Sequence, residues 1–291
     1  MKLTRKRFIW AVIVLALAYP VGRMLYYAPV IYRMFLRPDV FETVAPVLPD
    51  NLLHPAILVF SKTNGFRHED AIPAANRMLA EMADKQGWSM YQTENGALFN
   101  PAQLSKFDAV VFNNVSGNVF TPEQREAFKS YVENGGGFVG IHGSGGDPSY
   151  KWEWYVESLI GAQFIGHPMS PQFQEATLHV EDKTHPATQS LPNVWVRTDE
   201  WYSFKKSARK DGVQVLVTLD ESTYSPVGLA GQELKMGADH PIVWAHCEGK
   251  GRVLYSAIGH QAEAYAEPLY QGLLEGAIGW AARLQGTGCE Q

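Results

Sequence analysis

Short apolar runs alternate with longer amphipathic stretches from His54 onward. Runs of about five apolar residues are typical of strands buried on both faces, whereas apolar residues spaced three and four apart are typical of helices. The pattern predicts four strands joined by helices in the first half of the chain, as in a mostly parallel sheet covered on both faces. The predicted strands are 56–60, 89–93, 107–113 and 137–141, and the main helices are 71–86 and 122–133.

The second half of the chain is less regular but continues the same pattern. Apolar runs predict more strands, and an apolar stretch near the C-terminus predicts a last helix. We find no internal repeat or low-complexity tract. We therefore expect one α/β domain over residues 55–285, with a doubly wound, flavodoxin-like sheet and inserted loops. The added strands are 172–180, 213–219, 241–246 and 252–257, and the last helix is 268–284.

The N-terminus has the form of an export signal. Four basic residues between Lys2 and Arg7 precede an apolar stretch, 8–22, and apolar character resumes after Arg23 as far as Tyr32. We expect residues 1–36 to form an uncleaved membrane-anchor helix, with 37–54 as a linker. Basic residues before the anchor place the main domain outside the cytoplasm. Cleavage after the Ala16-Leu17-Ala18 motif remains the alternative.

Composition narrows the class of partner. The formal net charge is −5, and no long basic run occurs outside the N-terminus, so we expect no nucleic-acid binding. The two cysteines, Cys247 and Cys289, lie far apart without a C-x-x-C motif. This excludes a cysteine zinc cage, argues against a disulfide framework and gives little support to a thiol nucleophile. A small-molecule partner fits the composition best.

The most informative segment is the predicted strand 137–141, which ends in His142 between two glycines. Small neighbours allow a sharp turn at the carboxyl end of a strand, where α/β proteins bind ligands. We expect the turn to expose the His142 side chain as a base, an acid or a metal ligand. The glycines 135, 137 and 140 also spell G-x-G-x-x-G. A dinucleotide site is excluded because a helix precedes these glycines and a strand follows them.

Other candidate side chains fall at predicted strand ends or in loops. His68 and His260 follow strands, and we expect them to converge with His142. Glu200 is a candidate general acid with a raised pKa or a metal ligand, and the adjacent Trp201 and Tyr202 would form a platform for a sugar ring. We expect Asn113 and His167 to reach the crevice and bind substrate. The remaining histidines are interpreted as structural or incidental: His54, His179, His185, His240 and His246.

Imidazoles together with Glu200 would suit a divalent metal such as zinc, held by His142, His68 and His260. The spacing leaves this open, because the chain contains no H-E-x-x-H motif. Ser144 lies two residues after His142, which does not fit the G-x-S-x-G elbow of a serine hydrolase.

Several short motifs resemble those of ThuA-like (trehalose utilisation) proteins, whose fold is related to class I glutamine amidotransferases. The resemblance covers about residues 55–283 and implies that His142 replaces the elbow cysteine, so glutaminase activity is not expected. It also implies carbohydrate metabolism, on disaccharides through 3-keto sugars. The motifs are Gly65-Phe66-Arg67-His68, 107–113, 135–142, Gly166-His167-Pro168, Asp199-Glu200-Trp201-Tyr202, Pro241-Ile242-Val243-Trp244, Gly249-Lys250-Gly251-Arg252-Val253 and Gly259-His260.

These observations favour a membrane-anchored enzyme of sugar metabolism that uses acid/base or metal-assisted chemistry. Proton transfer beside a sugar carbonyl is a reaction that histidines and a carboxylate supply. The alternatives are a noncatalytic carbohydrate- or partner-binding protein and, with less support, an amidotransferase that uses Cys247.

Overall fold

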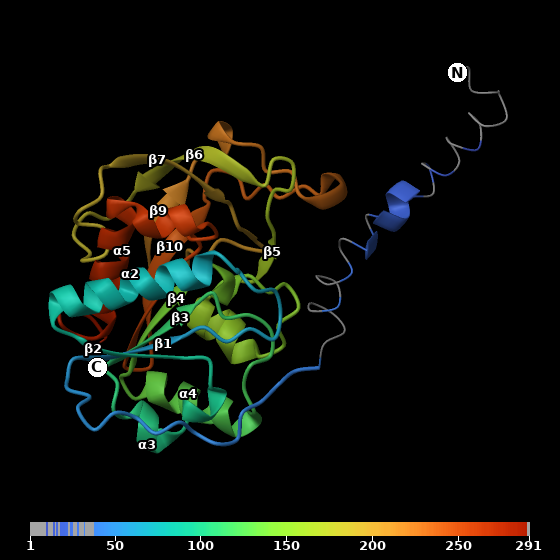
Figure 1. The fold of residues 1–291 in the computed structure, drawn as a ribbon. Helices are drawn as coiled ribbons and strands as arrows, with labels where there is room; N and C mark the ends of the chain where they lie inside the picture. The colour runs from blue at the N-terminus through green and yellow to red at the C-terminus, as the bar shows by residue number, and fades with distance from the viewer. Residues whose placement is uncertain are drawn as a thin grey trace.

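The computed structural model describes residues 38–289 without a break and, before them, only residues 10, 14, 16, 18–22, 24, 25, 28 and 32 (Figure 1). Most of the predicted anchor, 1–36, therefore lies outside the described residues. Within the described residues, no helix combines the length and the apolar character needed to cross a membrane. The anchor stays a prediction.

One large sheet forms the centre of the domain. Its strands are β1 (Ala56–Phe60), β2 (Ser89–Thr93), β3 (Ala109–Asn113), β4 (Gly137–Ile141), β6 (Phe173–Val180), β7 (Val194–Glu200), β9 (Val213–Leu219), β10 (Pro241–Glu248) and β11 (Gly251–Ser256). Their spatial order is β2-β1-β3-β4-β11-β10-β9-β6-β7 (Figure 1).

The sheet has a parallel half and an antiparallel half. The pairs from β2 through β11 are all parallel, as predicted from the first half of the chain. From β11 through β7 every pair is antiparallel, so the expectation of a mostly parallel sheet holds only for the first five strands. A separate small sheet pairs β5 (Phe164–Gly166) with β8 (Ser203–Phe204). The fold is α/β, with a mixed sheet.

Helices cover both faces of the parallel half. Helices α2 (Ala71–Gln86) and α5 (Pro268–Ala281) both contact β3, whereas α4 (Pro122–Glu133) contacts α3 (Pro101–Leu104) and β11. Helix α4 begins with a capping box, in which Thr121 accepts from the Gln124 backbone and Gln124 accepts from the Thr121 backbone. A π-helix (Trp154–Ile160) and five 3₁₀ turns complete the fold: Gly96–Leu98, His142–Gly145, Glu221–Thr223, Leu229–Gly231 and Ala262–Ala266.

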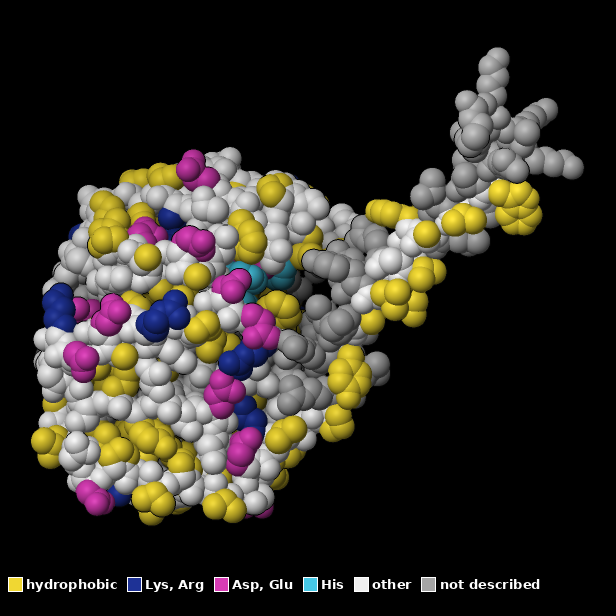
Figure 2. All heavy atoms as spheres, viewed as in Figure 1, with side chains coloured by type: hydrophobic (Ala, Val, Ile, Leu, Met, Phe, Trp, Pro, Cys, Tyr) yellow, Lys and Arg dark blue, Asp and Glu magenta, His cyan; other side chains and the backbone are white. Residues whose placement is uncertain are grey.

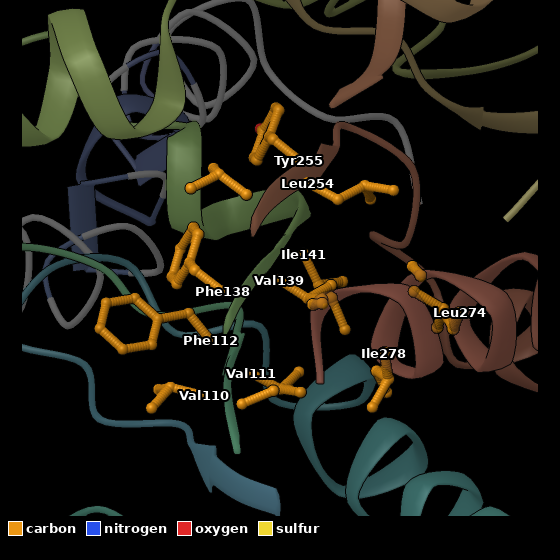
Figure 3. Close-up of a cluster of buried hydrophobic side chains, with 14 of the residues drawn as sticks. Val110, Val111, Phe112, Phe138, Val139, Ile141, Leu254, Tyr255, Leu274 and Ile278 are labelled. Atoms are coloured by element: carbon orange, nitrogen blue, oxygen red, sulfur yellow. The ribbon is translucent and has the colours of Figure 1, made fainter. Parts of the chain in front are cut away.

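Successive side chains of the two central strands, β3 and β4, point to opposite faces of the sheet, and both faces are packed in the core. Phe112 and Phe138 lie on one face, where their rings pack with Phe128 of α4. Figure 3 shows the other face, where Val139 and Ile141 point toward Leu274 and Ile278 of α5. Both faces of β3 and β4 are fully buried, which explains why their sequences read as continuous apolar runs.

Part of the predicted linker, 37–54, packs against the domain. Glu42 forms an ion pair with the nearly buried Lys62 and accepts a hydrogen bond from the Gly96 backbone. Gln124 donates to the backbone carbonyl of Glu42, and Gln103 donates to that of Pro46. The segment is held against the domain over several residues.

The two cysteines form a disulfide between β10 and the C-terminal tail. This corrects the expectation against a disulfide. The pairing depends on the tail folding back toward β10 and β11, where Arg252 donates to the backbone carbonyls of Trp280, Gln285 and Gly288. Because Cys247 is bonded to Cys289, the amidotransferase alternative has no thiol to use.

Candidate active site

His142 follows β4 in a strained turn. Its φ of 41° lies in the left-handed region, which costs free energy for a residue with a side chain and is found often at functional sites. The Tyr255 hydroxyl donates to the His142 carbonyl at 2.8 Å, which helps to hold the turn. Contrary to the sequence prediction, the His142 side chain is fully buried. The Tyr202 ring, with its centroid 4.2 Å from that of His142, covers it.

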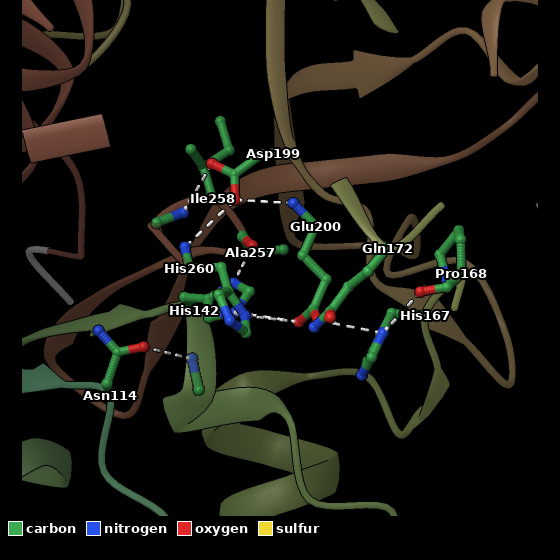
Figure 4. A network of polar contacts seen from close by, with 12 residues as sticks. Asn114, His142, His167, Pro168, Gln172, Asp199, Glu200, Ala257, Ile258 and His260 are labelled. Carbon is green, nitrogen blue, oxygen red and sulfur yellow. Dashed lines mark hydrogen bonds and ion pairs between the residues drawn. The ribbon is translucent and has the colours of Figure 1, made fainter. Parts of the chain in front are cut away.

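The contacts of the His142 ring indicate which of its two nitrogens carries a hydrogen. Its Nδ1 atom lies 2.7 Å from the carbonyl oxygen of Ala257, which only accepts hydrogen bonds, so Nδ1 carries a proton. In the neutral ring the lone pair is therefore on Nε2. Figure 4 shows this ring lying between Ala257 and Glu200. The strand end thus directs an imidazole lone pair inward, toward other polar side chains.

Three side chains from distant segments meet His142. His260 Nδ1 lies 3.2 Å from His142 Nε2, and Glu200 Oε2 lies 2.9 Å from His260 Nδ1 and 3.4 Å from His142 Nε2. One ligand atom from each of His68, His142, His260 and Glu200 lies within 4.8 Å of the other three. We call these four residues the His–Glu centre. The three histidines and Glu200 therefore lie together, as the sequence predicted.

Glu200 is held as a carboxylate. Burial alone raises its pKa, but hydrogen bonds with His142 and His260 and the charge of nearby imidazoles outweigh burial and leave the pKa below the ordinary value. The predicted raised pKa of a general acid is therefore wrong. His167 Nδ1 lies 3.1 Å from Oε1, and Gln172 donates to the same oxygen. The predicted approach of His167 to this site agrees with its position.

His68 stays uncharged. Burial lowers its pKa well below the usual range, and the neighbouring His142 and His260 lower it further. Its Nδ1 atom is buried and has no hydrogen-bond partner among the described residues. The ring packs so closely on Gly143 that a Cβ there would lie 2.8 Å from Cε1 of His68. His68 is therefore an uncharged imidazole of the centre that has one unpartnered nitrogen.

Asp199 organises the backbone around the centre, a role the sequence did not indicate. Its carboxylate accepts hydrogen bonds from the backbone N–H groups of Gly259, His260 and Glu200 at 2.8–3.2 Å. The buried Arg197 donates to the same carboxylate at 3.0 Å. The carboxyl end of β7 is thereby tied to the loop after β11. Residues 194–199 alternate between exposed and buried positions, with Arg197 and Asp199 buried and Val194 and Val196 exposed, so the sequence carries no apolar alternation that identifies them.

A pocket of about 730 Å³ opens over the centre. His68 and His260 form part of its lining, with the aromatic rings of Phe66 and Phe173 beside them. In Figure 2 histidine side chains are visible in a recess near one end of α2, with charged side chains around it. The remaining lining residues are Arg67, Glu69, Asp70, Pro73, Arg77, Gln261, Ala262 and Glu263. Its volume is typical of a small-molecule site.

Three predicted substrate contacts lie elsewhere. Trp201 is buried and its indole N–H donates to the Gln174 carbonyl, and Tyr202 is buried against His142, so neither ring offers a face to a sugar. Asn113 is buried and its amide donates to Ile72 and Asn76 of α2. The aromatic side chains at the pocket are Phe66 and Phe173, which sequence reasoning missed because single phenylalanines in loops or at strand starts carry no distinct pattern.

The other histidines have the structural positions assigned to them. His240 is buried between Glu221 and the Tyr202 carbonyl, and His246 is held by the Ser158 carbonyl. His185 packs against Trp280. His54 and His179 are exposed and make ion pairs with nearby aspartates. These five residues lie outside the His–Glu centre.

Comparison with known proteins agrees with the fold and the motifs. A family model for ThuA, described as trehalose utilisation, matches residues 56–281. A ThuA-like protein of Bacteroides uniformis is 26% identical, with a TM-score of 0.68 over 82% of this chain and 95% of its own. One of Parabacteroides merdae is 19% identical, with a TM-score of 0.61 over 80% and 91%, and shows the fold alone. No curated protein matches. The chain belongs to the ThuA, or trehalose utilisation, family.

Proposed function

We propose that this protein is a carbohydrate-processing enzyme that acts on a disaccharide or a 3-keto sugar at the His–Glu centre. The observation that carries the proposal is that two residues of this centre, His68 and His260, line a pocket of about 730 Å³. His142, His68, His260 and Glu200 come from four separate segments, and a cluster of this kind at the carboxyl edge of a sheet is the usual form of an α/β active site.

The chemistry that suits these groups is proton transfer at a carbon or oxygen beside a sugar carbonyl. Histidine is the side chain that most often transfers protons in enzymes, and the Glu200 carboxylate orients the rings of His142 and His260. Amide transfer from glutamine is not proposed, because the elbow position is His142 and both cysteines of the chain form the disulfide. The elbow was retained while its nucleophile was replaced, which supports acid/base or metal-assisted chemistry over covalent catalysis.

The pocket lining supports a neutral sugar as substrate. Phe66 and Phe173 offer apolar ring faces beside His68 and His260, and sugar rings stack their apolar faces on aromatic rings. Arginine and carboxylate side chains on the rim, such as Arg77 and Asp70, supply donors and acceptors for hydroxyl groups. Because both signs of charge occur on this rim, no strongly charged substrate is favoured.

The location that we propose is outside the cytoplasm, with residues 1–36 as a membrane anchor. The basic N-terminus followed by an apolar stretch supports export. The disulfide between Cys247 and Cys289 supports it independently, because disulfides persist in oxidising compartments and are rare in the cytosol.

A second candidate function is carbohydrate binding without turnover. Burial favours it, because the side chains of His142 and Glu200 are 0% and 1% exposed, so that a ligand in the pocket touches His68 and His260 first. Both candidate functions use the same pocket. They differ in whether the buried residues His142 and Glu200 take part in a reaction.

The test is a screen of disaccharides and their 3-keto derivatives with the full chain in detergent, with products followed by mass spectrometry. For a substrate that turns over, His142→Ala is expected to lower kcat by about 100-fold or more. His179→Ala, an exposed histidine outside the centre, serves as the matched control and should act like the wild type. Sugar binding with no turnover in any protein would favour the binding function, and full turnover by His142→Ala would refute the catalytic role of the centre.

A further inference from the structure

The geometry points to a divalent transition-metal ion, of which zinc is the type case, held by His68, His142, His260 and Glu200. This inference deepens the proposed function, because it assigns a cofactor to the same His–Glu centre. It is argued from the separations, hydrogen-bonding capacity and surroundings of these four side chains.

The separations among three of the four ligand atoms are those of ligands on one ion. Atoms bonded to one ion at about 2.0–2.1 Å lie about 2.9 Å apart in octahedral geometry and about 3.3 Å apart in tetrahedral geometry. The three pairs among His142 Nε2, His260 Nδ1 and Glu200 Oε2 are 3.2, 2.9 and 3.4 Å apart. All four ligand atoms lie within 4.8 Å of one another. This limit exceeds the separation of about 4.2 Å between ligands on opposite sides of an ion, so His68 moves closer to the other three when it binds the ion.

The polar atoms of the centre face one another at its middle. His142 donates Nδ1–H to the Ala257 carbonyl, so its Nε2 is the ring nitrogen directed at His260 and Glu200. Nδ1 of His260 and Oε2 of Glu200 lie against each other at the same place. Nδ1 of His68 is buried and has no hydrogen-bond partner among the described residues. When the imidazoles are neutral, their free nitrogens and the carboxylate oxygen are ligands for a cation.

The contacts behind the ligands are of the kind that support metal sites. Metal-bound histidines usually donate their second ring N–H to a carbonyl or carboxylate, which fixes the ring and its tautomer. His142 does so with Ala257. Gln172 and His167 hold the second oxygen of Glu200, and Asp199 fixes the backbone of His260. Three of the four ligands therefore have a defined orientation before any ion binds.

The ligand set indicates which ions fit. Three imidazole nitrogens and one carboxylate oxygen suit zinc, manganese, iron, cobalt or nickel, whereas calcium and magnesium prefer oxygen ligands. His68 and His260 also line the pocket, so the ion is reached from the side on which a sugar binds. A divalent ion there polarises a bound carbonyl or hydroxyl oxygen, which is the chemistry that proton transfer beside a sugar carbonyl requires.

The test measures metal binding by the full, untagged chain in detergent. After chelation and dialysis, Zn²⁺ and Co²⁺ are titrated by calorimetry, the bound metal is counted by elemental analysis, and the absorption spectrum of the Co²⁺ form is recorded. We expect about one ion per chain for the wild type and for the control His179→Ala. His142→Ala and Glu200→Gln should bind less than about a tenth of an ion under the same conditions. Gln172→Leu should keep the site with about 10-fold weaker affinity.

Thermal unfolding of each variant separates loss of the site from loss of the fold. His260→Ala provides a second ligand variant whose side chain is partly exposed and so is less disruptive. A folded wild type that takes up no Zn²⁺ or Co²⁺, or equal uptake by the wild type and all ligand variants, would overturn the inference. Sugar turnover that persists in the metal-free protein overturns the inference and leaves the proposed enzyme intact. Stoichiometric metal binding without turnover of any sugar supports the metal site and contradicts the proposed enzyme.

Discussion

Nε2 of His142 lies 3.2 Å from Nδ1 of His260, although the two residues are 118 positions apart in the sequence. The sheet explains the contact. Strands β4 and β11 are parallel neighbours, with Ile141 opposite Ser256, so the residues that follow each strand emerge at the same edge. Glu200 ends β7 at the far side of the sheet, and Asp199 joins it to the loop after β11. The strand order therefore brings His142 and His260 together, and the hydrogen bonds of Asp199 connect Glu200 to them.

Gly143→Ala should displace His68 without unfolding the protein. A Cβ at this position would lie 2.8 Å from Cε1 of His68 and 3.2 Å from Oδ1 of Asn114, so the His68 ring must move away from the centre. We expect kcat for the substrate found in the sugar screen to fall about 100-fold, with an unchanged melting profile. Gly279→Ala is the control, because its Cβ meets only the end of the Gln285 side chain. Normal kcat in Gly143→Ala would show that His68 is not required.

Phe66→Ala should weaken sugar binding. The Phe66 ring is partly exposed at the pocket, 4.9 Å between centroids from His68. Loss of one stacking face should raise KM about 10-fold and change kcat little. Trp201→Phe provides the contrast, because Trp201 is buried and its lost hydrogen bond to Gln174 should lower stability and leave KM unchanged. The reverse result in steady-state kinetics would restore Trp201 as the sugar platform.

Much of the parallel half could be predicted from the sequence, and much of the site could not. Strands such as 109–113 and 137–141 are buried on both faces, so their apolar runs identify them directly. Strand β7 was missed because it is an edge strand that exposes Val194 and Val196 and turns Arg197 inward. The charge of Arg197 is balanced by Asp199 and Glu267, and a contact with a residue 70 positions later leaves no local signal.

Burial explains the other corrections. The turn after β4 was expected to expose His142, but the Tyr202 ring covers it from a segment far along the chain. The lowered pKa of Glu200 depends on His142 and His260, so a neighbouring tryptophan in the sequence indicated the wrong direction. Sequence pattern identified the residue types and the sheet edge, whereas exposure and protonation depended on tertiary contacts.

Acid should destabilise the protein in part through His246. Burial lowers its pKa from 6.5 to about 4. The unfolded chain binds the proton first as pH falls, so the stabilisation is complete above about pH 7 and is lost progressively toward pH 4. Between pH 7 and 5.5 the loss should be about 1 kcal/mol for this residue. Urea unfolding of His246→Gln should show a correspondingly smaller pH dependence, and an unchanged dependence would contradict the assignment.

The disulfide should contribute a large part of the folding stability. Cys247 and Cys289 are separated by 42 residues, and closing a loop of that length stabilises a fold by about 4 kcal/mol in the chain-entropy treatment. Cys289→Ser should lower the free energy of unfolding in urea by this order, and adding a reductant to the wild type should have the same effect. Reductant should not affect the variant further. A wild type whose unfolding ignores reductant would show that the bond does not form in solution.

The central claim is that the His–Glu centre binds a metal ion beside the sugar pocket. The most direct measurement is a crystal structure of the full chain soaked in Co²⁺, with anomalous scattering recorded at the cobalt edge. We predict one strong peak at about 2.0–2.2 Å from His142 Nε2, His260 Nδ1 and Glu200 Oε2, with His68 as the fourth ligand. A peak confined to surface histidines, with His142, His260 and Glu200 still hydrogen-bonded to one another, would contradict the claim.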